Sequence, residues 1–149
     1  MKTLKTTLAL AALAALPMLA SAAVETYPLD PTHTYPSFAV EHWGLSMMHG
    51  RFDKTTGKFA FDRAAKTGST ELTIDTASLT TGDNVKGNRP QSRDDHLRSA
   101  DFFNTKEFPT MTFKSRALRR GGAGLELVGD LTLRGTTREV VLAVDGPTP

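Results

Sequence analysis

The sequence has 149 residues, 39% of them hydrophobic and 23% charged, a composition typical of a globular protein and unlike that of a disordered tail. It contains no cysteine, which excludes a disulfide framework, a thiolate metal site and a cysteine nucleophile. The 18 Lys and Arg residues exceed the 16 Asp and Glu residues by two, but Lys2 and Lys5 lie in a segment that we expect to be removed. The mature chain is then formally neutral, so nucleic acid, whose backbone binds clustered cations, is not an expected partner.

The first 22 residues have the pattern of a secretory signal peptide. Met1 to Lys5 is short and basic, residues 8–16 contain only leucine and alanine, and Ala20-Ser21-Ala22 offers the small side chains that a signal peptidase accepts. The alternative, a membrane anchor, requires roughly 20 apolar residues, whereas Pro17 interrupts this run. We therefore expect export with cleavage near Ala22, and a single mature domain over residues 23–149.

The mature chain is dominated by short runs in which apolar and polar residues alternate between turn-forming residues, which predicts β-strands. Because the alternation leaves one polar face, we expect an antiparallel sheet rather than a parallel α/β core. Residues 54–57 read as a hairpin-like break between two strands, and Gly135-Thr136 reads as a tight turn before the last strand. The seven expected strands are residues 34–42, 50–54, 57–61, 69–75, 111–117, 125–133 and 139–144.

One short helix is expected in the long connection between the fourth and fifth strands. Ser92 and Asp95 approximate a capping box, and Pro90 cannot lie deep inside a helix. The helix is therefore predicted over Arg93–Ala100. No repeat, linker or composition shift divides the chain, which indicates one all-β domain with a helical insertion.

The histidines give weak support for catalysis and none for a metal site. None of them has the spacing of a helical or strand-borne metal chelate, so no metal is expected. His42, on the apolar face of its strand, reads more simply as a hydrogen-bonded core residue than as a ligand. His96 follows Asp94 and Asp95, which could orient it as a base, although a surface histidine beside a capping aspartate explains the same residues.

Eight phenylalanines serve this small domain, and they occupy the expected strands and the surroundings of the helical insertion. They can fill an ordinary core, or they can line the interior of a small barrel that holds one ligand. Alternation alone does not decide between these two arrangements. The phenylalanines are Phe38, Phe52, Phe59, Phe61, Phe102, Phe103, Phe108 and Phe113.

Several segments, in their order and spacing, resemble the YceI-like family of exported proteins from Tyr27 to about Val144. The opening match consists of residues 27–33 with Phe38, His42 and Gly50-Arg51-Phe52. The middle and late matches are residues 95–103, 108–113 and 129–137. The combination is specific, although no single motif would be.

The resemblance implies a lipocalin-like antiparallel barrel in the bacterial periplasm that encloses a polyisoprenoid lipid, such as a prenyl phosphate or a quinone tail. It implies no catalytic constellation and no cofactor, and related sequences are associated with stress responses and with b561-type membrane cytochromes. The candidate ligand-binding residues lie on apolar faces within the matched segments. They are Phe38, Val40, His42, Phe52, Phe113, Leu131 and Leu133.

Three alternatives stay open beside a lipid carrier. The protein can act as an envelope stress or interaction module that contacts the inner membrane or a cytochrome, it can pair as a homodimer, or it can be a hydrolase that uses His96 or His42. Family members usually continue past residue 149, and an up-and-down barrel closes with an even number of strands. With seven strands, we expect a barrel that is incomplete at its C-terminus and open beside its first strand.

Overall fold

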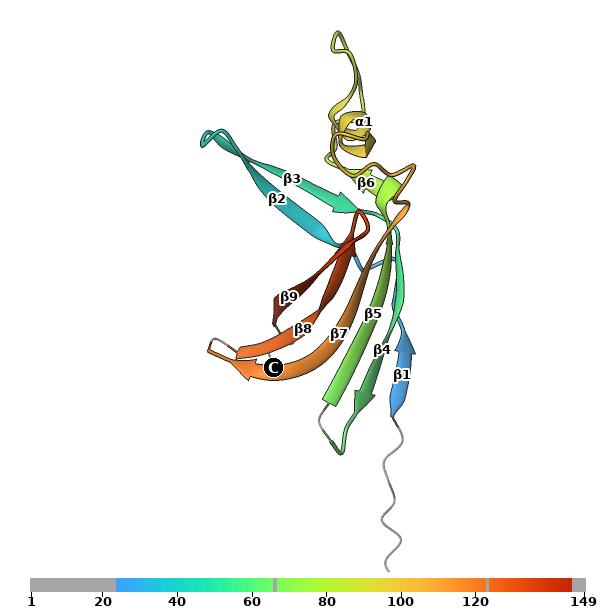
Figure 1. Cartoon of the computed structure of the whole chain (residues 1–149), viewed down its shortest axis with the longest axis vertical. Coiled ribbons are helices and arrows are strands. Elements are labelled where there is room, and N and C mark those ends of the chain that lie inside the picture. The colour runs from blue at the N-terminus through green and yellow to red at the C-terminus, as the bar shows by residue number, and fades with distance from the viewer. Residues whose placement is uncertain (1–23, 66, 123, 146–149) are drawn as a thin grey trace, which may run out of the picture.

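The computed structural model describes residues 24–65, 67–122 and 124–145, so the expected signal peptide lies outside the described residues. Every strand pairing among these residues is antiparallel (Figure 1). The strands are β1 (Glu25–Pro28), β2 (Ser37–His42), β3 (Ser46–Phe52), β4 (Thr55–Asp62), β5 (Thr67–Asp75), β6 (Leu79–Thr80), β7 (Thr110–Gly121), β8 (Gly124–Leu133) and β9 (Thr136–Val144), and the helices are the 3-10 turn η1 (Thr76–Ser78) and α1 (Arg93–Arg98).

The strands form two sheets that meet at one end of the molecule. The larger sheet has the order β1-β4-β5-β7-β8-β9, and the smaller has the order β2-β3-β6. The hairpin of β2 and β3 projects away from the curved larger sheet (Figure 1). Within the described residues β2 pairs only with β3, and β9 only with β8, so the sheets do not close. The expected all-β, lipocalin-like but incomplete barrel is thus confirmed, including the opening beside β2.

The register places apolar side chains on the face of the larger sheet that is turned toward the smaller one. Leu72 of β5 lies opposite Phe113 of β7, which in turn lies opposite Leu131 of β8. Residues directly opposite one another in antiparallel strands share a face, so these three form one apolar row. Farther along β7 the register with β8 shifts between Ser115 and Ala117, and a bulge of this kind increases the bend of a strand.

The buried core lies where the two sheets and the helical insertion meet. Phe52, Ile74, Leu79 and Met111 form its centre, and each comes from a different strand. Partly buried apolar residues pack around this centre and include Leu97 of α1. The core therefore ties the small sheet to the large one at a single end.

The expected hairpin at residues 54–57 is wrong. Thr55 begins β4 and lies opposite Ile74 of β5, whereas β3 pairs with β2 and β6. The backbone amides of Asp53 and Lys54 donate to the carbonyl and hydroxyl oxygens of Ser78 at 3.2 and 3.0 Å. Because these donors are used by η1, the chain crosses from one sheet to the other at this point.

Three boundaries also differ from the sequence-based expectation. The expected seven strands become nine, since β1 and β6 have only four and two residues and are too short to show alternation. Helix α1 ends at Arg98 and not at Ala100, because Ser99 is extended, with φ −69° and ψ 174°. The last turn is centred on Arg134 and Gly135, both with positive φ, as two-residue hairpin turns require.

Candidate functional site

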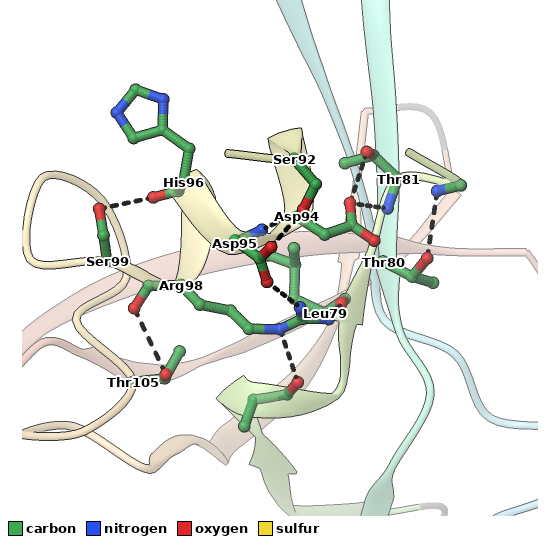
Figure 2. A network of polar contacts seen from close by, with 12 residues as sticks. Leu79, Thr80, Thr81, Ser92, Asp94, Asp95, His96, Arg98, Ser99 and Thr105 are labelled. Carbon is green, nitrogen blue, oxygen red and sulfur yellow. Dashed lines mark hydrogen bonds and ion pairs between the residues drawn. The ribbon is translucent and has the colours of Figure 1, made fainter. Parts of the chain in front are cut away.

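A polar network fixes the helical insertion against β6 (Figure 2). The Ser92 hydroxyl accepts a hydrogen bond from the Asp95 amide at 3.1 Å, which confirms Ser92 as the N-cap of α1. The other half of the expected capping box differs, because the Asp95 carboxylate accepts from the Ser92 hydroxyl at 2.7 Å and not from the Ser92 backbone amide. Arg98 donates to the carbonyl oxygens of Ala77, at 3.0 Å, and Leu79. These contacts hold α1 in place, so that its side chains form a fixed wall beside the core.

Asp94 is the buried anchor of this network, with 1% of its surface exposed. Its Oδ1 accepts hydrogen bonds from the Thr81 amide and hydroxyl at 2.8 and 2.6 Å (Figure 2). Its Oδ2 has no hydrogen-bond partner within the part of the chain that the structure describes. The carboxylate thus joins α1 to the chain that leaves β6.

We predict that Asp94→Ala lowers the free energy of unfolding by about 1.5–3 kcal/mol, because it leaves both Thr81 donors without their charged acceptor. Asp94→Asn is the matched control, since its Oδ1 can still accept from Thr81, and we expect a clearly smaller loss. Urea unfolding of both variants measures the difference. Equal losses in the two variants would contradict an anchoring role for Oδ1.

An apolar cavity lies between the β2–β3 hairpin and the helical insertion. Its volume is about 480 Å³, within the range of roughly 300–1,000 Å³ that small-molecule pockets occupy. We call it the upper cavity. Its walls come from β2, β3 and the segment from Thr81 to Phe103, and the lining residues are Phe38, Val40, His42, Met48, Thr81, Arg93, His96, Leu97, Phe102 and Phe103.

A second apolar cavity, the lower cavity, lies against the inner face of the larger sheet. Its volume is about 360 Å³, and Ser37 is the one polar side chain among the described residues that line it. The others are Pro36, Phe38, Phe52, Leu72, Ile74, Phe103, Met111, Phe113, Leu131, Leu133, Val140 and Leu142.

The two cavities meet at Phe38 and Phe103, which line both of them. The centroids of these two rings are 6.1 Å apart. Phe52 lies 6.0 Å from Phe38 and 5.4 Å from Phe103, with an edge-on contact to the latter. The three rings therefore pack against one another at the junction of the two cavities, which we call the neck, and the two cavities together make up the apolar space on either side of it.

All seven candidate ligand-binding residues line this space. Val40 and His42 line the upper cavity; Phe52, Phe113, Leu131 and Leu133 line the lower one; Phe38 lines both. The structure thus brings residues of β2 and β3 together with residues of β7 and β8, which lie far from them in the sequence. Their role in binding a ligand stays a prediction.

Sequence reasoning missed other lining residues, above all Phe103, Met48 and the pair Val140 and Leu142. Alternation could not single out the last two, because residues 140–144 are all apolar. Phe103 lies in the irregular segment after α1, where periodicity carries no information. Its amide donates to the Leu97 carbonyl at 3.0 Å, which folds this segment back over the helix.

The polar side chains of the lining gather in the upper cavity. They are His42, Thr81, Arg93 and His96, and the His96 Nε2 lies 3.2 Å from a carboxylate oxygen of Asp101. Beside the cavity, Asp83 accepts two hydrogen bonds from Arg89, at 2.6 and 2.7 Å, and lies 3.3 Å from Arg93. The bonds from Arg89, together with both positive charges, lower the pKa of Asp83.

The described residues offer little for catalysis. The one hydroxyl group among those that line the upper cavity belongs to Thr81, and no carboxylate lines it. In the described ranges there is no cluster of three or more histidine, aspartate or glutamate side chains suited to a metal ion. No helix in these ranges is long and apolar enough to cross a bilayer.

Comparison of the sequence with known proteins identifies the family of this chain. A family model described as the YceI-like domain matches residues 27–147. The chain belongs to the YceI-like family. Among YceI-like relatives, Protein YceI of Escherichia coli is 37% identical over 125 residues, which are 82% of this chain and 62% of that protein. A UPF0312 protein of Vibrio cholerae is 37% identical over 135 residues, 89% of this chain and 68% of the relative.

Solved YceI-like structures share the fold. The crystal structure of Burkholderia cenocepacia BcnA matches with a TM-score of 0.59 and 28% identity, over 75% of this chain and 70% of BcnA. That of the Campylobacter jejuni YCEI protein matches with a TM-score of 0.55 and 30% identity, over 77% of this chain and 64% of that protein. This chain spans about 62% of the length of the Escherichia coli relatives that it matches.

Proposed function

We propose that this protein is exported to the periplasm and binds a polyisoprenoid lipid, such as a prenyl phosphate or a quinone, without acting on it chemically. The observation that carries the proposal is the pair of apolar cavities that meet at Phe38 and Phe103. A linear chain that displaces the rings of these two residues can occupy both cavities, whereas a compact molecule fits only one of them. Membership of the YceI-like family supports the same function.

The physical case rests on the size of the apolar contribution. Each buried methylene contributes about 0.8 kcal/mol, so a five-carbon isoprene unit contributes roughly 3–4 kcal/mol before the cost of ordering the chain. A single hydrogen bond contributes about 1 kcal/mol net. Burial of the tail therefore dominates the affinity, and a few polar contacts suffice to orient the head group.

The distribution of polar side chains supports one orientation of the proposed lipid. The lower cavity is lined almost entirely by apolar residues, whereas the upper cavity presents His42, Thr81, Arg93 and His96. A hydrocarbon tail is therefore expected in the lower cavity. The polar head group is expected in the upper cavity, beside the helical insertion.

The test is organic extraction of the protein after its purification from a bacterial envelope. We expect mass spectrometry to detect a prenyl lipid that is bound in a near-stoichiometric amount. The intact mass of the purified protein should correspond to a chain that begins next to Ala22, as export requires. Protein from the periplasmic fraction with no extractable lipid would defeat the binding proposal.

One observation favours a second candidate function, a hydrolase. His42 and His96 both line the upper cavity, and His96 is paired with Asp101. If they act on a substrate, the double substitution His42→Ala and His96→Ala abolishes turnover and leaves the extracted lipid unchanged. We favour the binding function, because the one hydroxyl group among the described residues that line this cavity belongs to Thr81 and donates its proton to the buried Asp94 instead of to either histidine.

The open sheet edges favour a contact with another protein. Among the described residues β2 pairs only with β3 and β9 pairs only with β8, so each of these strands has one unpaired edge. The free backbone N–H and C=O groups along such an edge can pair with an added strand. A membrane cytochrome or a second copy of this chain is a candidate for that contact. Cross-linking from β9, with mass-spectrometric identification of the product, tests this possibility.

A further inference from the structure

The tip of the β2–β3 hairpin exposes two large apolar side chains. Trp43 is 86% exposed and Leu45 is 85% exposed. The Leu45 amide donates to the His42 carbonyl at 3.1 Å, which closes a turn around Trp43 and Gly44. The hairpin carries this turn outward from the rest of the molecule (Figure 1).

The position of Trp43 has no explanation in folding. Both central residues of the turn have positive φ, 57° at Trp43 and 69° at Gly44, a conformation that favours asparagine followed by glycine. A bulky residue in this region is strained. The Trp43 ring gains only a stacking contact with His42, at 5.0 Å between centroids. An aromatic residue that is strained and almost fully exposed points to a contact with another molecule.

The apolar surface at the tip continues into the upper cavity. Val40 and Met47 are exposed on the same hairpin, and Val40, His42 and Met48 line the cavity. Across the cavity, residues 81–93 contain Lys86, Arg89 and Arg93 against a single acidic residue, Asp83, which gives this segment two excess positive charges. The hairpin tip and this basic segment project from the same end of the molecule (Figure 1).

We propose that the tip formed by Trp43 and Leu45 inserts into the interface of a lipid bilayer with anionic head groups, while residues 81–93 lie against those head groups. Tryptophan prefers this interface, because its ring is apolar and its N–H is polar. Basic side chains near an anionic surface add attraction. The upper cavity then opens toward the membrane, where lipid ligands are found.

The small area of the tip argues for a membrane and against a second copy of the chain. A specific protein interface buries roughly 800 Å² on each partner, which a three-residue turn cannot supply. A bilayer requires no complementary surface, so two inserted side chains and a few basic contacts suffice for reversible binding. This proposal goes beyond ligand binding and does not depend on it.

Trp43 is the only tryptophan in the sequence, so fluorescence excited at wavelengths that the two tyrosines do not absorb reports on this site alone. We expect vesicles of phosphatidylethanolamine and phosphatidylglycerol to shift its emission to shorter wavelength, and brominated acyl chains in the same vesicles to quench it. Vesicles of phosphatidylcholine should give a weaker effect, and added salt should weaken the binding to anionic vesicles. Unchanged emission with anionic vesicles would overturn the proposal.

Variants separate insertion from other causes of a shift. Leu45→Ser should lower the vesicle-binding constant roughly tenfold or more, because one of the two buried side chains is lost. Leu125→Ser, at an exposed leucine at the start of β8, is the matched control and should leave binding unchanged. Equal losses in the two variants would overturn the proposal.

Two further outcomes identify a different occupant. A shift in emission that follows protein concentration without vesicles would show pairing of two chains and overturn the proposal. The proposal would also be overturned if dissolved polyisoprenol caused the same shift in emission and brominated vesicles did not quench the emission. That result would place the ligand, and not the membrane, beside Trp43. Extraction of lipid from Leu45→Ser tests the cavity separately: retained lipid without vesicle binding is the expected result for this variant.

Discussion

Phe52→Ala is expected to lower the free energy of unfolding by about 3–5 kcal/mol, the range found when a buried phenylalanine is truncated. Phe52 is 3% exposed and belongs to the core that joins the two sheets. Its ring also contacts Phe38 and Phe103 at the neck between the cavities. Truncation therefore removes packing from the one place where the small sheet is held. Chemical denaturation followed by circular dichroism measures the loss.

Phe59→Ala is the matched control for this prediction. Phe59 is 39% exposed and stacks on Phe61, away from the core centre. We expect it to lower the free energy of unfolding by about 1 kcal/mol. A Phe52→Ala variant no less stable than Phe59→Ala would show that the core is not centred where the two sheets meet.

Val40→Asp is expected to reduce the lipid that co-purifies with the protein by about tenfold or more. Val40 lines the upper cavity yet is 55% exposed, so a carboxylate there is tolerated by the fold. A hydrocarbon chain passing Val40 would lose its apolar contact or desolvate the charge. Desolvating an unpaired carboxylate costs more than about 1.4 kcal/mol, which corresponds to tenfold or more in affinity. Quantitative mass spectrometry of organic extracts measures the effect.

Ala39→Asp provides the control, because neighbouring residues of a strand point to opposite faces. Ala39 is exposed and does not line either cavity. The same charge one residue away should leave the lipid content unchanged. Equal loss of lipid in the two variants would show that the upper cavity is not part of the binding site. The melting temperatures of both variants should equal that of the unaltered protein, which excludes unfolding as the cause of any loss of lipid.

The strand pattern was predictable where alternation runs over several residues. The stretch around Leu131 and Leu133 shows an apolar face and a polar face, and the structure places both leucines in the lower cavity. The N-cap at Ser92 was predictable because it depends on residues three positions apart. Local chemistry decides such features, so the sequence suffices for them.

Features decided by distant contacts were not predictable. Lys54 reads as part of a hairpin turn, but its amide bonds to Ser78, which is 24 residues away. Phe103 reads as one of several phenylalanines near the helix, yet it forms the neck between the cavities. Strand β6 has two residues and exists because Arg51 and Phe52 of β3 lie opposite it. None of these three contacts is marked by a periodic pattern of apolar residues in the sequence.

Only two residue pairs, Arg51 with Thr80 and Phe52 with Leu79, join the β2–β3 hairpin to β6. The opposite wall of the lower cavity belongs to a sheet of six hydrogen-bonded strands. We therefore expect the sheet to be stiffer than the hairpin, so that a wider ligand would move the hairpin about its base and leave the pairing within the sheet intact. A cavity of this kind would accept ligands of different width and hold each of them against the same sheet.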